Sequence, residues 1–352
     1  MWIETDFPFS NMSVMSSADL KIAADKINLY ISDILENDGS FRREGKLCAF
    51  VTVATPSYDF GLKALLASIR RHSSIPIIVL ASRRWAFETG LPGVYLLVVP
   101  SLHHEEYAPL RPEIRISLTK LWIFGMLSLR RIVFLDADCL VVKPIDELFD
   151  ASGLCCAADC IESSESARLN SGLIAFDPSP ELRNLVFEKA HETPSYDHGD
   201  QGMLDIILRP MVKYLPSEYN FTRHYSFFHG PEASPEAARV IHYIVKKPWE
   251  LWYRETPDVA LVDLDDLWTS QLSREELLQL ISFWRRRQFI AERPRFEALH
   301  QRGSHLIHTW SQIFRNSRRF RYFVALMVSV ACLSLAMLVC LEIVWIFGWF
   351  RS

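Results

Sequence analysis

The sequence lacks several patterns that would place it in a familiar class. Its seven cysteines form no paired C-x-x-C motifs of zinc-finger type. Their odd number, with Cys332 and Cys340 inside an apolar run, argues against a disulfide framework. No excess of basic residues is present either, because the formal net charge is -4, so we expect no nucleic-acid partner. Glu4 and Asp6 stand where a secretory signal would be basic and then apolar. These absences predict reduced thiols and a domain that faces the cytosol.

Charge is also absent from one long segment near the end of the chain. Residues 322–341 contain no charged side chain, and about twenty helical residues cross roughly 30 Å of hydrocarbon. Trp345 and Trp349 follow where an aromatic belt would lie. The alternative is a buried core helix, although core helices rarely stay apolar on every face for so long. The pattern therefore predicts one C-terminal transmembrane anchor at 322–350.

The charges that flank this segment predict its orientation. No acidic residue lies between Glu297 and Glu342, only Arg351 follows the segment, and five arginines precede it: Arg302, Arg315, Arg318, Arg319 and Arg321. The positive-inside rule then keeps the large N-terminal part on the cytoplasmic side. We therefore expect a single-pass membrane protein whose catalytic part faces the cytosol.

Apolar residues in the first half of the chain alternate between two periods. Helical spacing predicts helices over 19–36, 61–72 and 117–129, and short apolar runs predict strands over 47–54, 75–81, 94–99 and 131–135. Strands separated by helices are typical of a mostly parallel sheet covered on both faces. In such α/β sheets, ligands bind beyond the carboxyl ends of the strands.

The pattern changes after residue 260. Ser273 and Glu276 form a capping box that predicts the start of an amphipathic helix, and basic residues follow it. We divide the chain into an N-terminal segment at 1–46, a catalytic domain at 47–260, a helical basic stalk at 261–321 and the membrane anchor.

Two carboxylates follow the strand predicted at 131–135. Asp136 and Asp138 lie two residues apart at its carboxyl end, so both can reach one hard cation. Such a cation can bridge a diphosphate and neutralise the charge that grows as a sugar leaves. Asp-x-Asp alone is a weak signal, since a solvated turn produces the same pattern. It gains weight from polar clusters that begin or end later apolar segments and that suit a cleft for a hydroxyl-rich ligand.

The order of these motifs resembles glycosyltransferase family 8, the retaining enzymes that include glycogenin and galactinol synthases. The resemblance covers roughly residues 47–253 and rests on these motifs in the family's order: Thr55…Tyr58…Gly61, Leu118-Thr119-Lys120-Leu121, Phe134 to Asp138, Asn170-Ser171-Gly172, Gly199-Asp200-Gln201-Gly202, Tyr219-Asn220 and His242…Lys247-Pro248-Trp249. It implies a Rossmann-like fold of the GT-A type and hexosyl transfer from a UDP-sugar. The acceptor stays open among glycan, lipid and protein, and a homodimer stays open as an assembly.

The resemblance also implies a role for each matching residue. Asp136, Asp138 and His242 would bind the divalent ion, Mn²⁺ or else Mg²⁺. Lys247 would reach the diphosphate, and Asp200 and Gln201 would act at the reacting face of the donor sugar. The expected substrate contacts are Thr55, Tyr58, Lys120, Asp159, Asn170 and Asn220. Trp249 we expect to pack rather than to touch ligand.

Two departures and two rival functions accompany this interpretation. Only five positions separate His242 from Lys247, and no glycine lies between them, which places the fine geometry of the phosphate contact in question. One rival is a membrane-bound adaptor that has kept the fold and lost catalysis. The other is a nucleotidyltransferase, which would normally carry a glycine-rich phosphate loop near the first strand, where Thr55-Pro56-Ser57-Tyr58 stands instead.

Overall fold

The computed structural model describes residues 2–3, 5, 11–13, 16–37, 41–43, 46–103, 117–159, 168–190, 192–222, 235–244, 247–250 and 259–284. Among these residues, no helix is both long and apolar enough to cross a bilayer. The predicted anchor at 322–350, its arginine-rich flank and most of the predicted stalk lie outside the described residues. The described chain up to Ser282 belongs to one compact unit.

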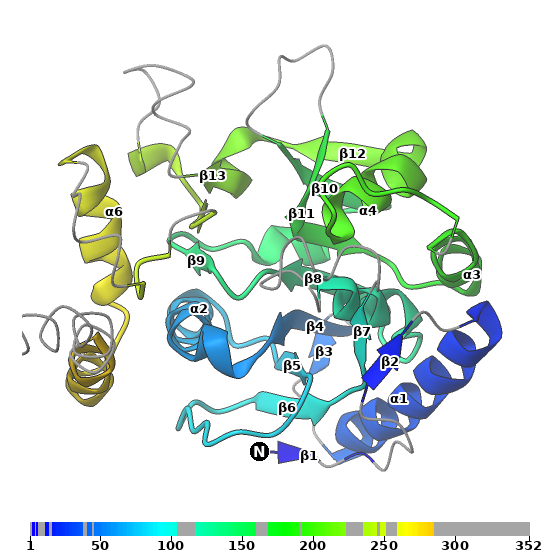
Figure 1. Ribbon diagram of the computed structural model, residues 1–352, viewed down its shortest axis with the longest axis horizontal. Helices are drawn as coiled ribbons and strands as arrows, with labels where there is room; N and C mark the ends of the chain where they lie inside the picture. The colour runs from blue at the N-terminus through cyan, green and yellow to red at the C-terminus, as the bar shows by residue number, and fades with distance from the viewer. Residues whose placement is uncertain are drawn as a thin grey trace, which may run out of the picture. The chain divides into compact units, whose positions relative to one another are not determined.

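A mostly parallel sheet forms the centre of this unit (Figure 1). In the described chain its strands run in the order β1-β6-β5-β4-β8-β11-β10-β12, with β3 beside β4. β11 runs antiparallel to its neighbours, β8 and β10, and the short β3 runs antiparallel to β4. The bounds are β1 Trp2–Ile3, β3 Arg42–Arg43, β4 Lys46–Ala54, β5 Ile77–Ala81, β6 Val94–Val98, β8 Arg131–Leu135, β10 Leu154–Ala158, β11 Leu169–Phe176 and β12 Val212–Leu215. The α/β class and the mostly parallel sheet predicted from the sequence are confirmed.

Helices cover both faces of the sheet. Alternate residues of β4 enter different cores: Ala49 and Val51 pack with α1, α3 and α4, whereas Cys48 and Phe50 pack with α2. Figure 1 shows α1 and α3 on one side of the strands and α2 on the other. The bounds are α1 Ser17–Asn37, α2 Asp59–His72, α3 Pro180–Lys189, α4 Asp200–Leu208 and α6 Val259–Thr269. Burial on both faces explains why the strands are continuous apolar runs.

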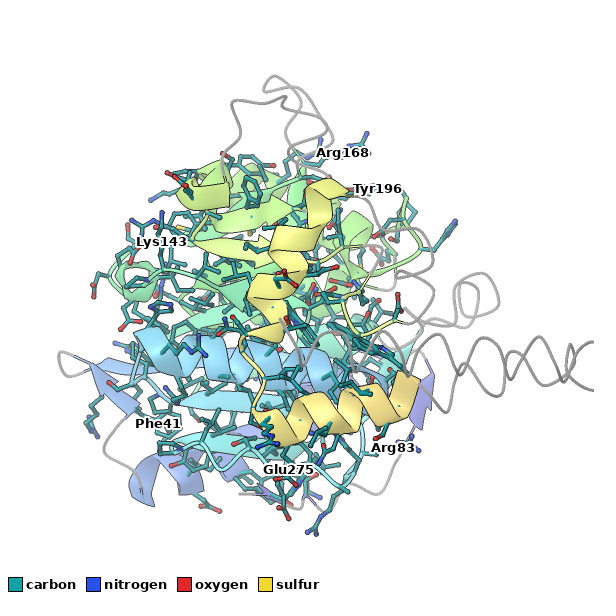
Figure 2. All side chains as sticks on the ribbon, turned by 90° about the vertical axis from the view of Figure 1, so that its left-hand side faces the viewer. Phe41, Arg83, Lys143, Arg168, Tyr196 and Glu275 are labelled. Carbon is teal, nitrogen blue, oxygen red and sulfur yellow. The ribbon has the colours of Figure 1, made fainter. Side chains whose placement is uncertain are left out.

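Side chains fill the space between these layers, as the stick view in Figure 2 shows. Phe41 is fully buried in the core on the side of α1, α3 and α4, whereas charged Arg83 and Glu275 lie at the surface. The predicted capping box is confirmed: Glu276 N–H donates to Ser273 Oγ (3.2 Å), and Ser273 N–H donates to Glu276 Oε2 (2.7 Å). Residues 274–284 are helical.

One predicted helix differs in type and length. The helix expected over 117–129 is a 3₁₀ helix, η4, at Ser117–Gly125. Every residue from Thr119 to Gly125 is buried, and Trp122 Nε1 donates to Pro100 O at 2.8 Å. A segment buried on all sides is shaped by its surroundings rather than by an amphipathic period.

Two small sheets complete the described fold. The first pairs β2, Asn11–Ser13, with β7, Ser101–His103. The second has the order β13-β14-β9, with β13 Phe221–Thr222, β14 Val240–His242 and β9 Cys139–Val141. Because β9 begins four residues after β8 ends, the turn between them joins the main sheet to the second small sheet.

Candidate active site

The predicted site residues gather at one edge of the main sheet for a topological reason. β4, β8 and β10 end at this edge, and antiparallel β11 begins there. Thr55 follows β4, Asp136 follows β8 and Asp159 follows β10, while Asn170 is the second residue of β11. The edge therefore holds the carboxyl ends at which ligands bind in α/β folds.

The turn Asp136–Asp138 is held by backbone hydrogen bonds on both sides. Asp136 N–H donates to Gly172 O of β11 at 2.9 Å, and Cys139 N–H donates back to Asp136 O at 2.9 Å. Tyr243 N–H, directly after β14, donates to Asp138 O at 3.0 Å. These bonds fix the backbone that presents the two carboxylates.

Asp138 is the centre of a buried cluster of charge. Its Oδ1 lies 3.2 Å from His242 Nε2, and its Oδ2 accepts a hydrogen bond from Lys247 Nζ. Lys247 Nζ also donates to Tyr243 O at 2.8 Å. Burial raises the pKa of Asp138, but the charges of Lys247 and His242 outweigh burial and lower that pKa below its ordinary value.

Two residues hold the ring of His242 in place. Its Nδ1 lies 3.0 Å from Asn220 Oδ1, and Asn220 Nδ2 donates to Ala158 O at 3.0 Å, which orients the amide. Gly172 leaves space for the ring, because a Cβ at that position would lie 2.2 Å from His242 Cε1. The imidazole thus directs Nε2 towards Asp138, with Nδ1 held from behind.

Lys120 forms a second buried cluster beside the first. Its Nζ lies 3.0 Å from Asp136 Oδ1 and 2.6 Å from Asp200 Oδ2, and it donates to Ser171 O at 3.1 Å and to Ser171 Oγ at 2.9 Å. Burial acts to lower the pKa of Lys120, but Asp136 and Asp200 outweigh it and raise the pKa. One ammonium therefore links the turn after β8 with the start of α4.

Polar side chains continue along the sheet edge from this cluster. Gln201 Nε2 donates to Asp159 Oδ2 at 3.1 Å, and Gln201 Oε1 accepts from Ser171 N–H at 3.4 Å. Asn170 Oδ1 accepts from Gly172 N–H at 2.9 Å. The amide and carboxylate groups are thus arranged side by side across β10, β11 and α4, where they can bind hydroxyl groups.

Tyr58 lies on the other flank of Asp138. Its ring meets Trp249 edge to face at 5.6 Å between centroids, and Lys247 Nζ lies 5.8 Å from the Tyr58 centroid. Burial is the main effect that raises the pKa of Tyr58 to about 12. Trp249 is buried against Gly61 of α2, in agreement with the packing role predicted for it. Thr55 stands apart, with its hydroxyl 2.7 Å from Ser57 Oγ.

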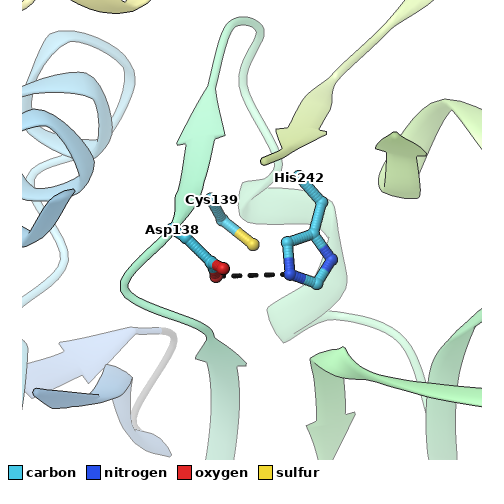
Figure 3. A group of neighbouring side chains, drawn as sticks. All are labelled: Asp138, Cys139 and His242. Carbon is cyan, nitrogen blue, oxygen red and sulfur yellow. Dashed lines mark ion pairs between the residues drawn. The ribbon is translucent and has the colours of Figure 1, made fainter. Parts of the chain in front are cut away.

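The donor set can be tested against a divalent ion. Within the described chain, the group of potential ligands whose atoms lie within 4.8 Å of one another is Asp138, Cys139 and His242 (Figure 3). A buried carboxylate and an imidazole held by its second nitrogen suit a divalent cation. Asp136, also predicted as a ligand, faces Lys120 instead, and its role as a ligand stays a prediction. Cys139 was missed by sequence reasoning, since a lone cysteine after Asp-x-Asp carries no signal.

Comparison with known proteins identifies the class. A profile described as glycosyl transferase family 8 matches residues 157–253. Glycogenin-1 of Mus musculus is 32% identical over 235 residues, which cover 62% of this chain and 69% of that protein. Glycogenin-1 of Homo sapiens is also 32% identical, over 58% of this chain and 63% of that protein. The chain therefore belongs to glycosyltransferase family 8, and it spans about two thirds of the length of these two relatives.

More distant likenesses cover smaller or more diverged regions. Inositol phosphorylceramide glucuronosyltransferase 1 of Arabidopsis thaliana is 42% identical over 87 residues, 25% of this chain and 15% of that protein. A solved structure of the galactosyltransferase LgtC, with donor and acceptor sugar analogs, is 18% identical. It covers 66% of this chain and 99% of its own at a TM-score of 0.48, a likeness that identifies neither substrate nor site residues.

Proposed function

We propose that this protein transfers a hexosyl unit from a UDP-sugar to an acceptor, with retention at the anomeric carbon and with a divalent ion. The observation that supports it is the pair of clusters around the turn after β8, in which Asp138 faces His242 and Lys247 while Asp136 faces Lys120 and Asp200. We propose Asp136, Asp138 and His242 as ligands of Mn²⁺ or Mg²⁺. When bound, such an ion neutralises charge on a diphosphate leaving group.

The chain's own residues would divide the remaining work. Lys247 carries a compact positive charge next to Asp138, so we propose that it contacts the diphosphate. Tyr58, half-buried and within reach of Lys247, would stack on the uracil, with Thr55 at the rim of the base site. Asn170, Gln201 and Asp159 would bind hydroxyl groups of the donor sugar.

Retention requires either a covalent intermediate or attack from the face that the leaving group vacates. Asp200 is the carboxylate that we consider as a nucleophile, but its Oδ2 lies 2.6 Å from Lys120 Nζ. An ion-paired carboxylate is a weaker nucleophile than a free one, because the ammonium stabilises its charge. We therefore favour same-face attack, in which Lys120, Asp200 and Gln201 bind and orient the donor and the leaving diphosphate provides the base.

The acceptor is left open by the relatives, which include glycogenin-1 and an inositol phosphorylceramide glucuronosyltransferase. We propose a membrane location, with the catalytic unit on the cytoplasmic side of one C-terminal helix. The support is the uncharged run at 322–341 and the arginines that precede it. The test is fractionation of the full chain beside a chain truncated after Gln301. Full-length protein in the soluble fraction without detergent would contradict the anchor.

The decisive experiment for the reaction is a panel of UDP-sugars with Mn²⁺, read by UDP release and by the mass of the product. Excess chelator should stop turnover, and added Mn²⁺ should restore it. Asp138→Asn should lower the rate by at least about a hundredfold, since it removes charge that holds the ion. Donor binding without turnover of any sugar would favour the adaptor. Transfer of the uridylyl group with release of the sugar 1-phosphate, in place of UDP, would favour a nucleotidyltransferase.

A further inference from the structure

Cys139 is held opposite His242 by strand pairing. The antiparallel pair β9–β14 aligns Cys139 with His242, Leu140 with Ile241 and Val141 with Val240. Residues directly opposite one another in such a pair place their side chains on the same face, with Cβ atoms about 5 Å apart. Asp138 lies in the turn just before β9, and its carboxylate lies close to the side chains of Cys139 and His242. Figure 3 shows the Cys139 sulfur directed between the carboxylate and the imidazole.

Together, the three buried side chains offer one oxygen, one nitrogen and one sulfur, all within 4.8 Å. This mixed set is typical of tetrahedral Zn²⁺, which combines carboxylate, imidazole and thiolate ligands, whereas Mn²⁺ and Mg²⁺ prefer oxygen. A tetrahedral ion with bonds of about 2.0 Å places two ligands about 3.3 Å apart. The 3.2 Å between His242 Nε2 and Asp138 Oδ1 matches that spacing.

The hydrogen bond of the Cys139 thiol is weak. Cys139 Sγ donates a weak hydrogen bond to Gly172 O at 3.6 Å, and the same carbonyl already accepts Asp136 N–H at 2.9 Å. The carbonyl therefore stays paired when the sulfur turns towards an ion. In the exchange a metal–sulfur bond forms, the S–H bond breaks, and the proton passes to solvent.

From this geometry we infer that Asp138, Cys139 and His242 form a binding site for a thiophilic divalent ion such as Zn²⁺, with Cys139 as its thiolate ligand. Because Asp138 and His242 are also proposed ligands of the hard ion that transfer requires, the two ions compete. Zinc bound through Cys139 then acts as an inhibitor of the proposed reaction. The binding part of this inference is independent of the proposed function, and the inhibition part rests on it.

The binding test uses Co²⁺ alone as a spectroscopic probe on the metal-stripped full chain. A thiolate ligand gives a sulfur-to-cobalt charge-transfer band, and Zn²⁺ should displace it. We expect the band in the parent and in Cys155→Ala, a buried cysteine of β10 outside the cluster. It should be lost in Cys139→Ala and Cys139→Ser, with Zn²⁺ affinity lowered by at least about tenfold. Circular dichroism of each variant confirms that it is folded.

Cysteines elsewhere in the chain contribute the same background to every variant, so the signal of interest is the difference between parent and Cys139 variants. A difference of zero would overturn the inference, whichever variant folds. His242→Gln provides a second route, because it should remove the band without touching the sulfur.

The inhibition test measures UDP release at fixed Mn²⁺ with increasing Zn²⁺. The half-inhibitory Zn²⁺ concentration should rise by at least about tenfold in Cys139→Ser, relative to that variant's own rate without zinc. A cobalt band without any transfer would contradict the proposed function and leave the zinc site standing. Transfer without a cobalt band would contradict the zinc site alone.

Discussion

His242 and Asn220 are joined side chain to side chain, with 3.0 Å between Nδ1 of the imidazole and Oδ1 of the amide. Asn220 Nδ2 is committed to Ala158 O, so Oδ1 is the atom that faces the ring. The ring therefore donates from Nδ1. In the neutral ring the Nε2 lone pair is then available to a cation, whereas Nε2 pairs with Asp138 when it also carries a proton. Asn220 thus sets the orientation and tautomer of a proposed metal ligand.

Removing this support should weaken the cation site. We expect Asn220→Ala to raise the Mn²⁺ concentration needed for half-maximal UDP release by about 10- to 100-fold, because outer-sphere partners of ligating histidines contribute that much. Asn220→Asp keeps an acceptor for Nδ1–H and should recover part of the loss. Unchanged Mn²⁺ dependence in a folded Asn220→Ala would contradict the role assigned to this contact.

Gly172 offers a steric test of the same imidazole. A Cβ there would lie 2.2 Å from His242 Cε1 and 2.9 Å from Asn170 Oδ1, so Gly172→Ala must displace the ring. We expect a folded protein with Mn²⁺ affinity lowered at least about tenfold. The measurement is Mn²⁺ titration by electron paramagnetic resonance. Ser171→Ala, its neighbour in β11, is the matched control, because Ser171 contacts Lys120 rather than His242. Equal Mn²⁺ affinity in both variants would contradict the proposal that the His242 ring, packed against Gly172, binds the ion.

The Lys120 cluster should govern folding stability. Lys120→Met leaves the half-buried carboxylate of Asp136 and the buried carboxylate of Asp200 without their shared cation. Breaking a buried ion pair typically costs about 3–5 kcal/mol in the free energy of unfolding. Adding Asp200→Asn to Lys120→Met should recover part of the lost unfolding free energy, because one of the two unpaired carboxylate charges is removed. Urea unfolding gives the values, with exposed Lys213→Met as control. A loss below about 1 kcal/mol would mean that the carboxylates find other partners.

How much of this could be predicted from sequence depends on how local the signal is. The strand at 131–135 and the carboxylates after it follow from a short apolar run and the residues that end it, and the structure places β8 at those bounds. The helix α1 follows from a strong apolar stripe. Lys120 was more difficult, because the surrounding 3₁₀ helix takes its shape from burial on all sides.

Contacts that depend on register between distant strands could not be predicted. Cys139 and His242 meet because β9 pairs with β14, about a hundred residues further along the chain. Neither strand has a pattern of its own at three residues each. The salt bridge from Lys120 to Asp200 likewise requires α4 to begin beside η4, which periodicity does not reveal.

The pKa of Asp138 predicts how stability changes with pH. Lys247 helps to hold that pKa below its unfolded value of about 4, so the folded state binds fewer protons at acidic pH. The stabilisation is fully present above about pH 4 and is lost as the pH falls below it. In chelator, the difference in unfolding free energy between parent and Lys247→Met should therefore shrink from pH 6 towards about pH 3. Lys143→Met, at an exposed lysine whose ammonium donates to the backbone carbonyl of Glu236, should show no such trend. A constant difference for Lys247→Met would contradict the pairing with Asp138.

Lys247 also separates an enzyme from an adaptor. Its ammonium faces Asp138 and Tyr243 O, next to the ring of Tyr58, which places it between the proposed cation and base sites. Negative charge on a diphosphate rises as the sugar leaves, so a contact with this ammonium strengthens in the transition state. An interaction that strengthens there raises the chemical rate more than it tightens ground-state binding. Lys247→Ala should therefore lower kcat by at least about tenfold more than it weakens UDP-sugar affinity.

Lys246→Ala is the matched control, since it removes the same charge one position earlier. Donor affinity by calorimetry and kcat by UDP release should be measured for both variants and the parent. A loss confined to Lys246→Ala would show that the phosphate contact lies one residue earlier, a shift that the five-position spacing from His242 to Lys247 makes testable. Equal kcat in all three proteins would mean that neither lysine touches the diphosphate. Donor binding that is unaffected by Lys247→Ala, in a protein that turns over no sugar, would instead support an adaptor that has kept the fold.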